Sequence, residues 1–145
     1  MDTILEIVLV EDNADDEELI LRTLQKNNLA NRIQVVRDGA EALDLLLPDG
    51  DAPTNKSQPK LVLLDLKLPK IDGLEVLRRL KSDPKTKTIP VVVLTSSNAE
   101  QDIIKSYQLG VNGYVTKPID FGQFTEAVRQ LGLYWLAVNQ PPHYE

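Results

Sequence analysis

Polar side chains follow four short apolar runs of this sequence, at the point where each run ends. Carboxylates come after two of the runs, at Glu11-Asp12 and at Asp65, and Thr95 and Lys117 close two others. Carboxylate oxygens suit Mg²⁺, which proteins usually hold through one or two carboxylates and several waters. A carboxylate between a divalent cation and an ammonium group can accept a phosphoryl group, because the charge on the transferring oxygens is then neutralised.

Five apolar runs predict the β-strands that must position these side chains. The predicted strands cover residues 4–10, 32–36, 61–64, 90–94 and 113–116. The predicted helices, with apolar residues at helical spacing, follow Asn13, Gly39, Asp72, Ser97 or Asn98, and Asp120. This alternation predicts a parallel sheet with helices on both faces. Right-handed crossovers favour a doubly wound, flavodoxin-like α/β fold with strand order 2-1-3-4-5.

The predicted topology brings the polar side chains to one edge of the sheet. The carboxyl ends of parallel strands share an edge, and a doubly wound fold has its ligand crevice there. Strands one and three are neighbours in the predicted order, so Glu11, Asp12 and Asp65 should lie close together. Like charges raise one another's pKa unless a cation compensates them. The chain has no Cys and one His, so a soft metal would find few ligands, and we predict Mg²⁺.

Local signals mark the ends of several helices. Asp72 and Asp120 are predicted N-caps. Asn13 stands before an acid-rich helical stretch, whose acidic run at 15–18 suits a first helical turn through the macrodipole. Gly73 is predicted to serve the turn after Asp72.

The helix that ends at Gly110 is predicted to point three apolar side chains inward: Ile103, Ile104 and Tyr107. The composition of residues 48–60 predicts an exposed loop, and His143 is predicted to be a solvated tail residue.

The last helix is predicted to extend to about residue 139. Its apolar stripe consists of Phe121, Phe124, Val128, Leu131, Trp135 and Val138. Packing on the sheet explains the first part of this stripe, but the later part is more apolar than one buried face requires. Exposed apolar patches often mark interfaces. We therefore predict a homodimer in which Tyr134, Trp135 and Val138 take part.

Length and composition limit the class of protein. The chain has 145 residues, of which 42% are hydrophobic and 26% charged, and we expect one globular domain across residues 1–145. Its formal net charge of −6 gives no overall attraction to nucleic acid or to an anionic membrane. Without a signal segment or a long apolar stretch, the expected location is the cytoplasm.

Four segments carry a resemblance to a known family. VEDN at 10–13, LLDLKLPKIDGLEVL at 63–77, VVVLTSSN at 91–98 and GYVTKP at 113–118 resemble the response-regulator receiver domain (CheY-like). The resemblance covers essentially the whole chain, and the segments occur in the family's order. It implies a phosphorylation switch, with Asp65 as the phosphoryl acceptor.

The resemblance also implies a metal site. Asp12 and Asp65 would bind Mg²⁺ directly, Glu11 would act through water, and the backbone carbonyl of Lys67 would supply a third protein oxygen. Glu11 stands where Asp is commoner in the family, a difference that bears on metal affinity.

Further roles follow from the same resemblance. Thr95 and Lys117 would contact the phosphoryl group, and the Lys117-Pro118 peptide bond would be cis. Tyr114 would be the aromatic residue that moves with Thr95 on activation.

A closer likeness lies within this family. Glu11-Asp12, the long loop at 48–60 and the tail YWLAVNQPP at 134–142 resemble stand-alone regulators paired with cyanobacterial phytochromes. The resemblance implies a sensor histidine kinase, such as a phytochrome, as the partner. Output would pass through protein contacts, or by phosphate relay to a histidine phosphotransfer protein.

Other functions on similar sheets fit less well. Phosphatases of the haloacid dehalogenase type place a second Asp two residues after the nucleophile, where this chain has Lys67. A flavin carrier would need a phosphate loop rich in Ser, Thr and Gly in place of Glu11-Asp12-Asn13. A receiver that signals without phosphorylation usually lacks an acidic, Thr or Lys position, and all are present. We therefore expect a signalling protein rather than an enzyme.

Overall fold

The computed structural model describes residues 5–30, 32–47 and 58–142, and in these ranges β-strands alternate with helices. The strands are β1 (Ile7–Val10), β2 (Ile33–Val36), β3 (Leu61–Leu64), β4 (Val91–Thr95) and β5 (Gly113–Thr116). The helices are α1 (Ala14–Lys26), α2 (Gly39–Leu46), α3 (Gly73–Ser82), α4 (Glu100–Gln108) and α5 (Phe121–Gly132), and α5 continues into a π-helical turn, η1 (Leu133–Val138). Most of the loop predicted at 48–60, and His143, lie outside the described residues.

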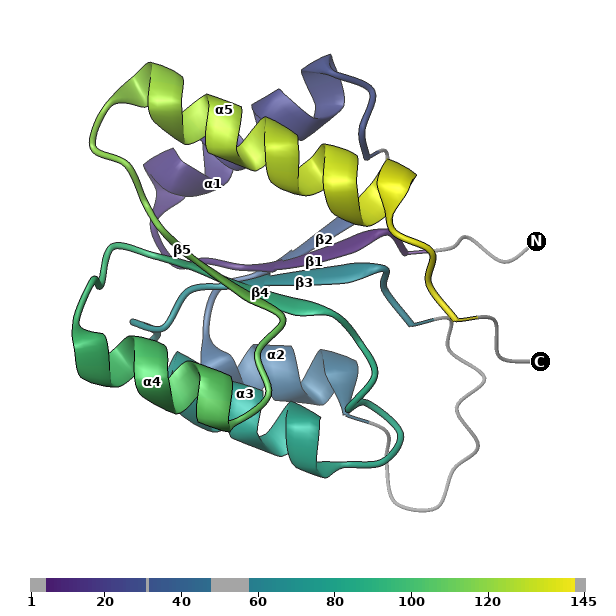
Figure 1. Ribbon diagram of the computed structural model, residues 1–145, viewed down its shortest axis with the longest axis vertical. Helices are drawn as coiled ribbons and strands as arrows, with labels where there is room; N and C mark the ends of the chain where they lie inside the picture. The colour runs from purple at the N-terminus through teal and green to yellow at the C-terminus, as the bar shows by residue number, and fades with distance from the viewer. Residues whose placement is uncertain (1–4, 31, 48–57, 143–145) are drawn as a thin grey trace.

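The five strands form one parallel sheet of order β2-β1-β3-β4-β5, which confirms the predicted topology. Helices α1 and α5 cover one face of the sheet, and α2, α3 and α4 cover the other (Figure 1). The registers align Val10 with Val36 on one side and with Leu64 on the other. The carboxyl ends of the central strands are therefore level with one another.

The apolar strands build two cores, one on each face of the sheet. Val8 and Val10 point to the face of α2 and α3, while Ile7 and Leu9 point to the face of α1 and α5. All residues of β1, β3 and β4 are buried, because each strand is covered on both faces. Full burial of one such side chain contributes about 1.5–3 kcal/mol. The strands that lead to the carboxyl edge of the sheet are therefore packed on both faces.

Side-chain caps begin four of the helices. Asn13, Asp72 and Asp120 cap α1, α3 and α5, and each accepts a hydrogen bond of 2.9 Å from an amide three residues later. Asp38 caps α2 in the same way. These bonds satisfy amides that a helix cannot pair internally.

Helix α4 departs from the predictions in two respects. Neither Ser97 nor Asn98 is its N-cap: the cap position is Ala99, which has no side-chain oxygen. The hydroxyl of Ser97 instead donates to Asp102, at 2.5 Å.

The predicted inward face of α4 is also wrong, because Ile104 and Tyr107 are 46% and 55% exposed. Ile103 is half-buried, and the fully buried residue of this helix is Ser106. The physical reason is that α4 packs against α3 and the edge strand β5, which cover it only in part. Gly110, with φ of 100°, ends the helix as predicted.

The apolar stripe of α5 and η1 is only partly buried. Phe124 and Val128 are buried and Trp135 is partly buried, whereas Phe121 and Val138 are 64% and 63% exposed. The apolar stripe is thus a core element only in its middle. In the part of the chain that the structure describes, no helix combines the length and apolarity needed to span a bilayer.

Candidate functional site

The carboxyl edge of the sheet brings together the polar residues that follow four strands. Glu11 follows β1, Asp65 follows β3, Thr95 ends β4 and Lys117 follows β5. Backbone hydrogen bonds hold these positions: the amide of Asp65 donates to Val10 O (3.0 Å) and the amide of Lys117 donates to Thr95 O (2.7 Å). The predicted convergence of the four side chains is observed.

Both carboxylate oxygens of Asp65 accept hydrogen bonds. Oδ1 accepts from the Thr95 hydroxyl at 2.8 Å and from the Lys67 amide at 3.1 Å, and Oδ2 accepts from Lys117 Nζ at 3.0 Å. Burial opposes ionisation of Asp65, but the charge of Lys117 and these hydrogen bonds outweigh it and lower the pKa of the carboxyl group. Asp65 is therefore an ionised, nearly buried carboxylate, the form that a nucleophile requires.

Lys117 is surrounded by three carboxylates. Its Nζ lies 2.7 Å from Glu11 Oε1, 2.8 Å from Asp16 Oδ2 and 3.0 Å from Asp65 Oδ2. Burial disfavours the ammonium form, yet hydrogen bonds to Asp16 and Glu11 and the charges of Glu11 and Asp65 prevail and raise the pKa of Lys117. Lys117 is thus a fixed positive charge beside Asp65.

Glu11 carries the least favourable charge of the site. It is 1% exposed, and burial raises its pKa to about 7 against the opposing effects of Lys117 and the Asn13 amide. One ammonium group does not compensate all the carboxylates at this edge. A divalent cation would supply the missing positive charge.

The acidic residues also have the arrangement of a cation site. Glu11, Asp12 and Asp65 each offer a carboxylate oxygen, and these oxygens lie within 4.8 Å of one another. All three are hard oxygen ligands, and Asp12 is exposed at the rim, where bound water could complete a coordination shell. The residues therefore fit Mg²⁺ or a similar ion. Lys67 contacts Asp65 through its amide, and metal binding by its carbonyl stays a prediction.

A chain of hydrogen bonds leads from Asp65 through Thr95 toward α4. The Ser97 amide donates to Thr95 Oγ1 at 3.4 Å, and the Tyr114 hydroxyl donates to the Ser97 carbonyl at 2.9 Å. Ser97 is also tied to Asp102 in α4. Tyr114 and Thr95, predicted to act together, are thus joined through one loop residue.

Glycine allows α3 to pack directly behind the acceptor residue. A Cβ atom at Gly73 would lie 2.5 Å from Leu66 Cα and closer still to the carbonyl oxygen of Asp65. The Gly73 amide donates to Leu66 O at 2.9 Å. The residue predicted to serve only a turn is therefore a point of close contact with the backbone of the site.

Two features of Lys117 differ from the sequence analysis. The Lys117-Pro118 bond is trans, since none of the described residues has a cis peptide bond. The predicted cis isomer is wrong for this structure: trans is the intrinsically preferred isomer of an X–Pro bond, and Lys117 reaches its carboxylates with the bond in that form.

The second difference is the contact of Lys117 with Asp16, a residue predicted only as part of an acidic helix start. A contact across 101 residues of sequence leaves no local signal that could have revealed it.

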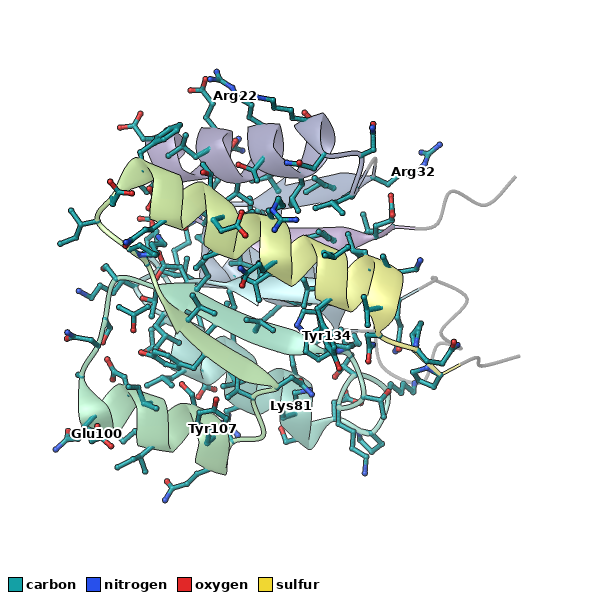
Figure 2. All side chains as sticks on the ribbon, turned by 45° about the horizontal axis from the view of Figure 1, so that its top comes forward. Arg22, Arg32, Lys81, Glu100, Tyr107 and Tyr134 are labelled. Atoms are coloured by element: carbon teal, nitrogen blue, oxygen red, sulfur yellow. The ribbon has the colours of Figure 1, made fainter. Side chains whose placement is uncertain are left out.

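The predicted interface residues lie away from this site. Tyr134, Trp135 and Val138 are in η1, at the far end of α5, and Figure 2 shows Tyr134 among the side chains there. Tyr134 is 49% exposed and packs edge-to-face on Trp135, with ring centroids 5.0 Å apart. Their part in a dimer stays a prediction.

Comparison with known proteins finds one family model and related regulatory proteins. The family model described as the response regulator receiver domain matches residues 7–129. The chain is 42% identical to the probable methanogenesis regulatory protein FilR2 of Methanothrix harundinacea, over 94% of this chain and 86% of FilR2. It is also 42% identical to the response regulator Rcp1 of Synechocystis sp., over 90% of this chain and 88% of Rcp1.

Solved structures agree with the sequence matches. The crystal structure of the phosphorylated cyanobacterial phytochrome response regulator RcpA superposes with a TM-score of 0.87 at 44% identity, covering 97% of this chain and all of RcpA. The Mn²⁺-bound form of Rcp1 gives a TM-score of 0.87 at 40% identity, covering 96% of this chain and 99% of that one.

Proposed function

Because the chain belongs to the response-regulator receiver family and resembles a phytochrome response regulator, we propose that it is a switch phosphorylated on Asp65. A partner histidine kinase supplies the phosphoryl group in the presence of Mg²⁺. The observation that carries the proposal is the setting of Asp65, whose carboxylate is held by Thr95, Lys117 and the Lys67 amide beside Glu11 and Asp12.

The residues of the chain supply most of what the transfer needs. An oxygen of Asp65 forms a bond to phosphorus as the P–N bond of the phosphohistidine breaks, and the electron pair of that bond stays on the imidazole nitrogen. Lys117 offsets negative charge on the transferring oxygens, and the Thr95 hydroxyl donates a hydrogen bond to one of them. Asp12 and Asp65 would bind Mg²⁺ directly, with Glu11 acting through water and Lys67 through its carbonyl. The metal would neutralise phosphoryl charge.

Thr95 also connects the site to a surface. If its hydroxyl turns from Asp65 to a phosphoryl oxygen, the hydrogen bond from the Ser97 amide to Thr95 Oγ1 must change. The backbone at Ser97, which the Tyr114 hydroxyl also contacts, must then adjust. The output is then a changed protein-binding surface around α4 and β5. The chain itself is a signalling protein and not an enzyme in this proposal.

The partner and location belong to the same proposal. Similarity to Rcp1 and RcpA supports a phytochrome as the kinase, and a cytoplasmic location would give access to such a kinase and to small phosphodonors. Transfer onward to a histidine phosphotransfer protein is the alternative output. Phosphotransfer from a light-regulated kinase, followed by incubation with candidate phosphotransfer proteins, would separate these outputs.

The homodimer is proposed from the exposed apolar residues of η1. Leu133, Tyr134 and Val138 are 40%, 49% and 63% exposed, and they adjoin Trp135 at the end of α5. Burial against a second copy would remove this apolar surface from water. Sedimentation of a monomer at high micromolar concentration, with and without phosphorylation, would refute the dimer.

The phosphorylation itself is tested by intact mass. The native chain and Asp65→Asn are incubated with acetyl phosphate and Mg²⁺, and the native chain is expected to gain one phosphoryl adduct that the variant lacks. An adduct that persists in Asp65→Asn would refute the assignment of the acceptor. Urea unfolding of both proteins shows whether the variant is folded.

A further inference from the structure

Lys117 has no hydrogen-bond donor left for a phosphoryl group. An ammonium group has three N–H donors, and Lys117 Nζ contacts one carboxylate each from Glu11, Asp16 and Asp65. The proposed function requires the same ammonium to contact a phosphoryl oxygen on Asp65. One of the three present contacts must therefore be given up or shared when the phosphoryl group arrives.

The three carboxylates differ in what their release would cost. The side chain of Glu11 is 1% exposed and that of Asp65 is 8% exposed, so neither can exchange Lys117 for water. Asp16 is 26% exposed, and it lies in the first turn of α1 rather than at the end of a strand. Water can solvate a released Asp16 carboxylate, whereas an unpaired buried carboxylate keeps its full desolvation cost.

The geometry points to Asp16 as a positioning residue for Lys117, a role that rests on the proposed phosphorylation of Asp65. We infer that Asp16 holds Lys117 in the unphosphorylated chain, and that Lys117 exchanges Asp16 for a phosphoryl oxygen when Asp65 is phosphorylated. Asp16 then opposes the phosphorylated state in two ways. It competes for the ammonium group, and once released it leaves a negative charge near the phosphoryl oxygens.

The start of α1 is held in place, so Asp16 cannot simply follow Lys117. The Asp16 amide donates to the cap residue Asn13 at 2.9 Å. The next residue, Glu17, accepts two hydrogen bonds of 3.0 Å from Arg37 at the end of β2. Two independent contacts thus anchor the turn that carries the Asp16 carboxylate.

The test uses Asp16→Ala, with Asp15→Ala as the matched control. Asp15 lies in the same turn and carries the same charge, but its exposed side chain makes no hydrogen bond or ion pair with the residues that the structure describes. Both variants remove one negative charge from the start of α1. Only Asp16→Ala frees a donor of Lys117.

The measurements are the fraction of phosphorylated chain at limiting acetyl phosphate with Mg²⁺, and the lifetime of the adduct after the donor is removed. We expect the ratio of phosphorylated to unphosphorylated chain for Asp16→Ala to rise about fivefold over the native chain, the factor that corresponds to about 1 kcal/mol. Asp15→Ala should stay within about twofold of native. A structural lesion at the start of α1 would lower phosphorylation, so a gain identifies the release of Lys117.

Two results separate this inference from the proposed function. If the native chain takes no phosphoryl group, the proposed function fails and this inference falls with it. If the native chain is phosphorylated but Asp16→Ala gains no more than Asp15→Ala, or loses phosphorylation, only the role of Asp16 is refuted. Asp16→Glu keeps the negative charge, so phosphorylation near the native level in that variant would support an electrostatic role.

Discussion

The contact between α3 and the acceptor backbone predicts a severe effect of Gly73→Ala. The new Cβ atom would lie 2.5 Å from Leu66 Cα and 3.1 Å from the carbonyl carbon of Asp65, and these are backbone atoms that cannot rotate away. Either α3 or the β3–α3 loop must shift. Overpacking of this kind typically costs about 1–3 kcal/mol, and we expect the free energy of unfolding to fall by that amount.

The same shift should reach the chemistry. Asp65 Oδ1 and Oδ2 are held at 2.8–3.1 Å by three donors, so a displaced backbone spoils several contacts together. A misplacement of about 1 Å can cost about a hundredfold in rate. We expect the rate of phosphorylation of Gly73→Ala by acetyl phosphate to fall by about tenfold to a hundredfold.

Gly113→Ala is the control for this prediction. A Cβ atom at Gly113 would meet only the Val92 side chain, at 3.5 and 3.6 Å, which is ordinary contact. Urea unfolding and the rate of adduct formation by intact mass are measured for both variants. Native stability and a native rate in Gly73→Ala would refute the view that close packing behind Asp65 sets its position.

Three further predictions concern charge. Burial raises the pKa of Glu11 to about 7, so the folded chain binds a proton more tightly than the unfolded chain does. The free energy of unfolding of the metal-free native chain should therefore fall as pH rises from about 4.5 through 7, and urea unfolding should show a smaller fall for Glu11→Gln. Mg²⁺ at a hundred times its dissociation constant should stabilise the native chain by about 2.7 kcal/mol. Thermal unfolding at the same Mg²⁺ concentration should show a clearly smaller stabilisation of Asp12→Ala. Arg78 and Arg79 hold the pKa of Glu75 near 2, so the stability that Glu75 contributes should be lost as pH falls from about 4.5 toward 2. The difference in the midpoint temperature of thermal unfolding between the native chain and Glu75→Gln should therefore narrow over that range. A difference that stays constant would contradict this role of Glu75.

Local patterns predicted the parts of the fold that depend on neighbouring residues. Continuous apolar runs such as the one ending at Val10 identify buried strands, and Asn13 and Asp72 identify helix starts, because strand burial and capping leave short-range signals. The convergence at the sheet edge followed from topology alone. Local patterns and sheet topology together were enough to predict the cluster of polar residues around Asp65.

Other features depend on contacts that no local pattern contains. The pairing of Asp16 with Lys117 and the packing of Gly73 behind Asp65 arise only when distant segments meet. The exposed face of α4 was missed for a related reason: helical spacing shows that Ile104 and Tyr107 share a stripe, but not whether the sheet is wide enough to cover it. The isomer of the Lys117-Pro118 bond rests on a small energy difference that residue type does not decide.

The missing cap of α4 has a consequence for how the molecule opens. Among α1 to α5, α4 alone begins without a side-chain cap, and much of its surface is in water. Elements with few buried contacts open at the lowest free energy. Amide protons in the first turn of α4 should therefore exchange with solvent before those of α1, α3 or α5. The start of α4 is then the helix terminus near Asp65 that changes conformation at the lowest free-energy cost.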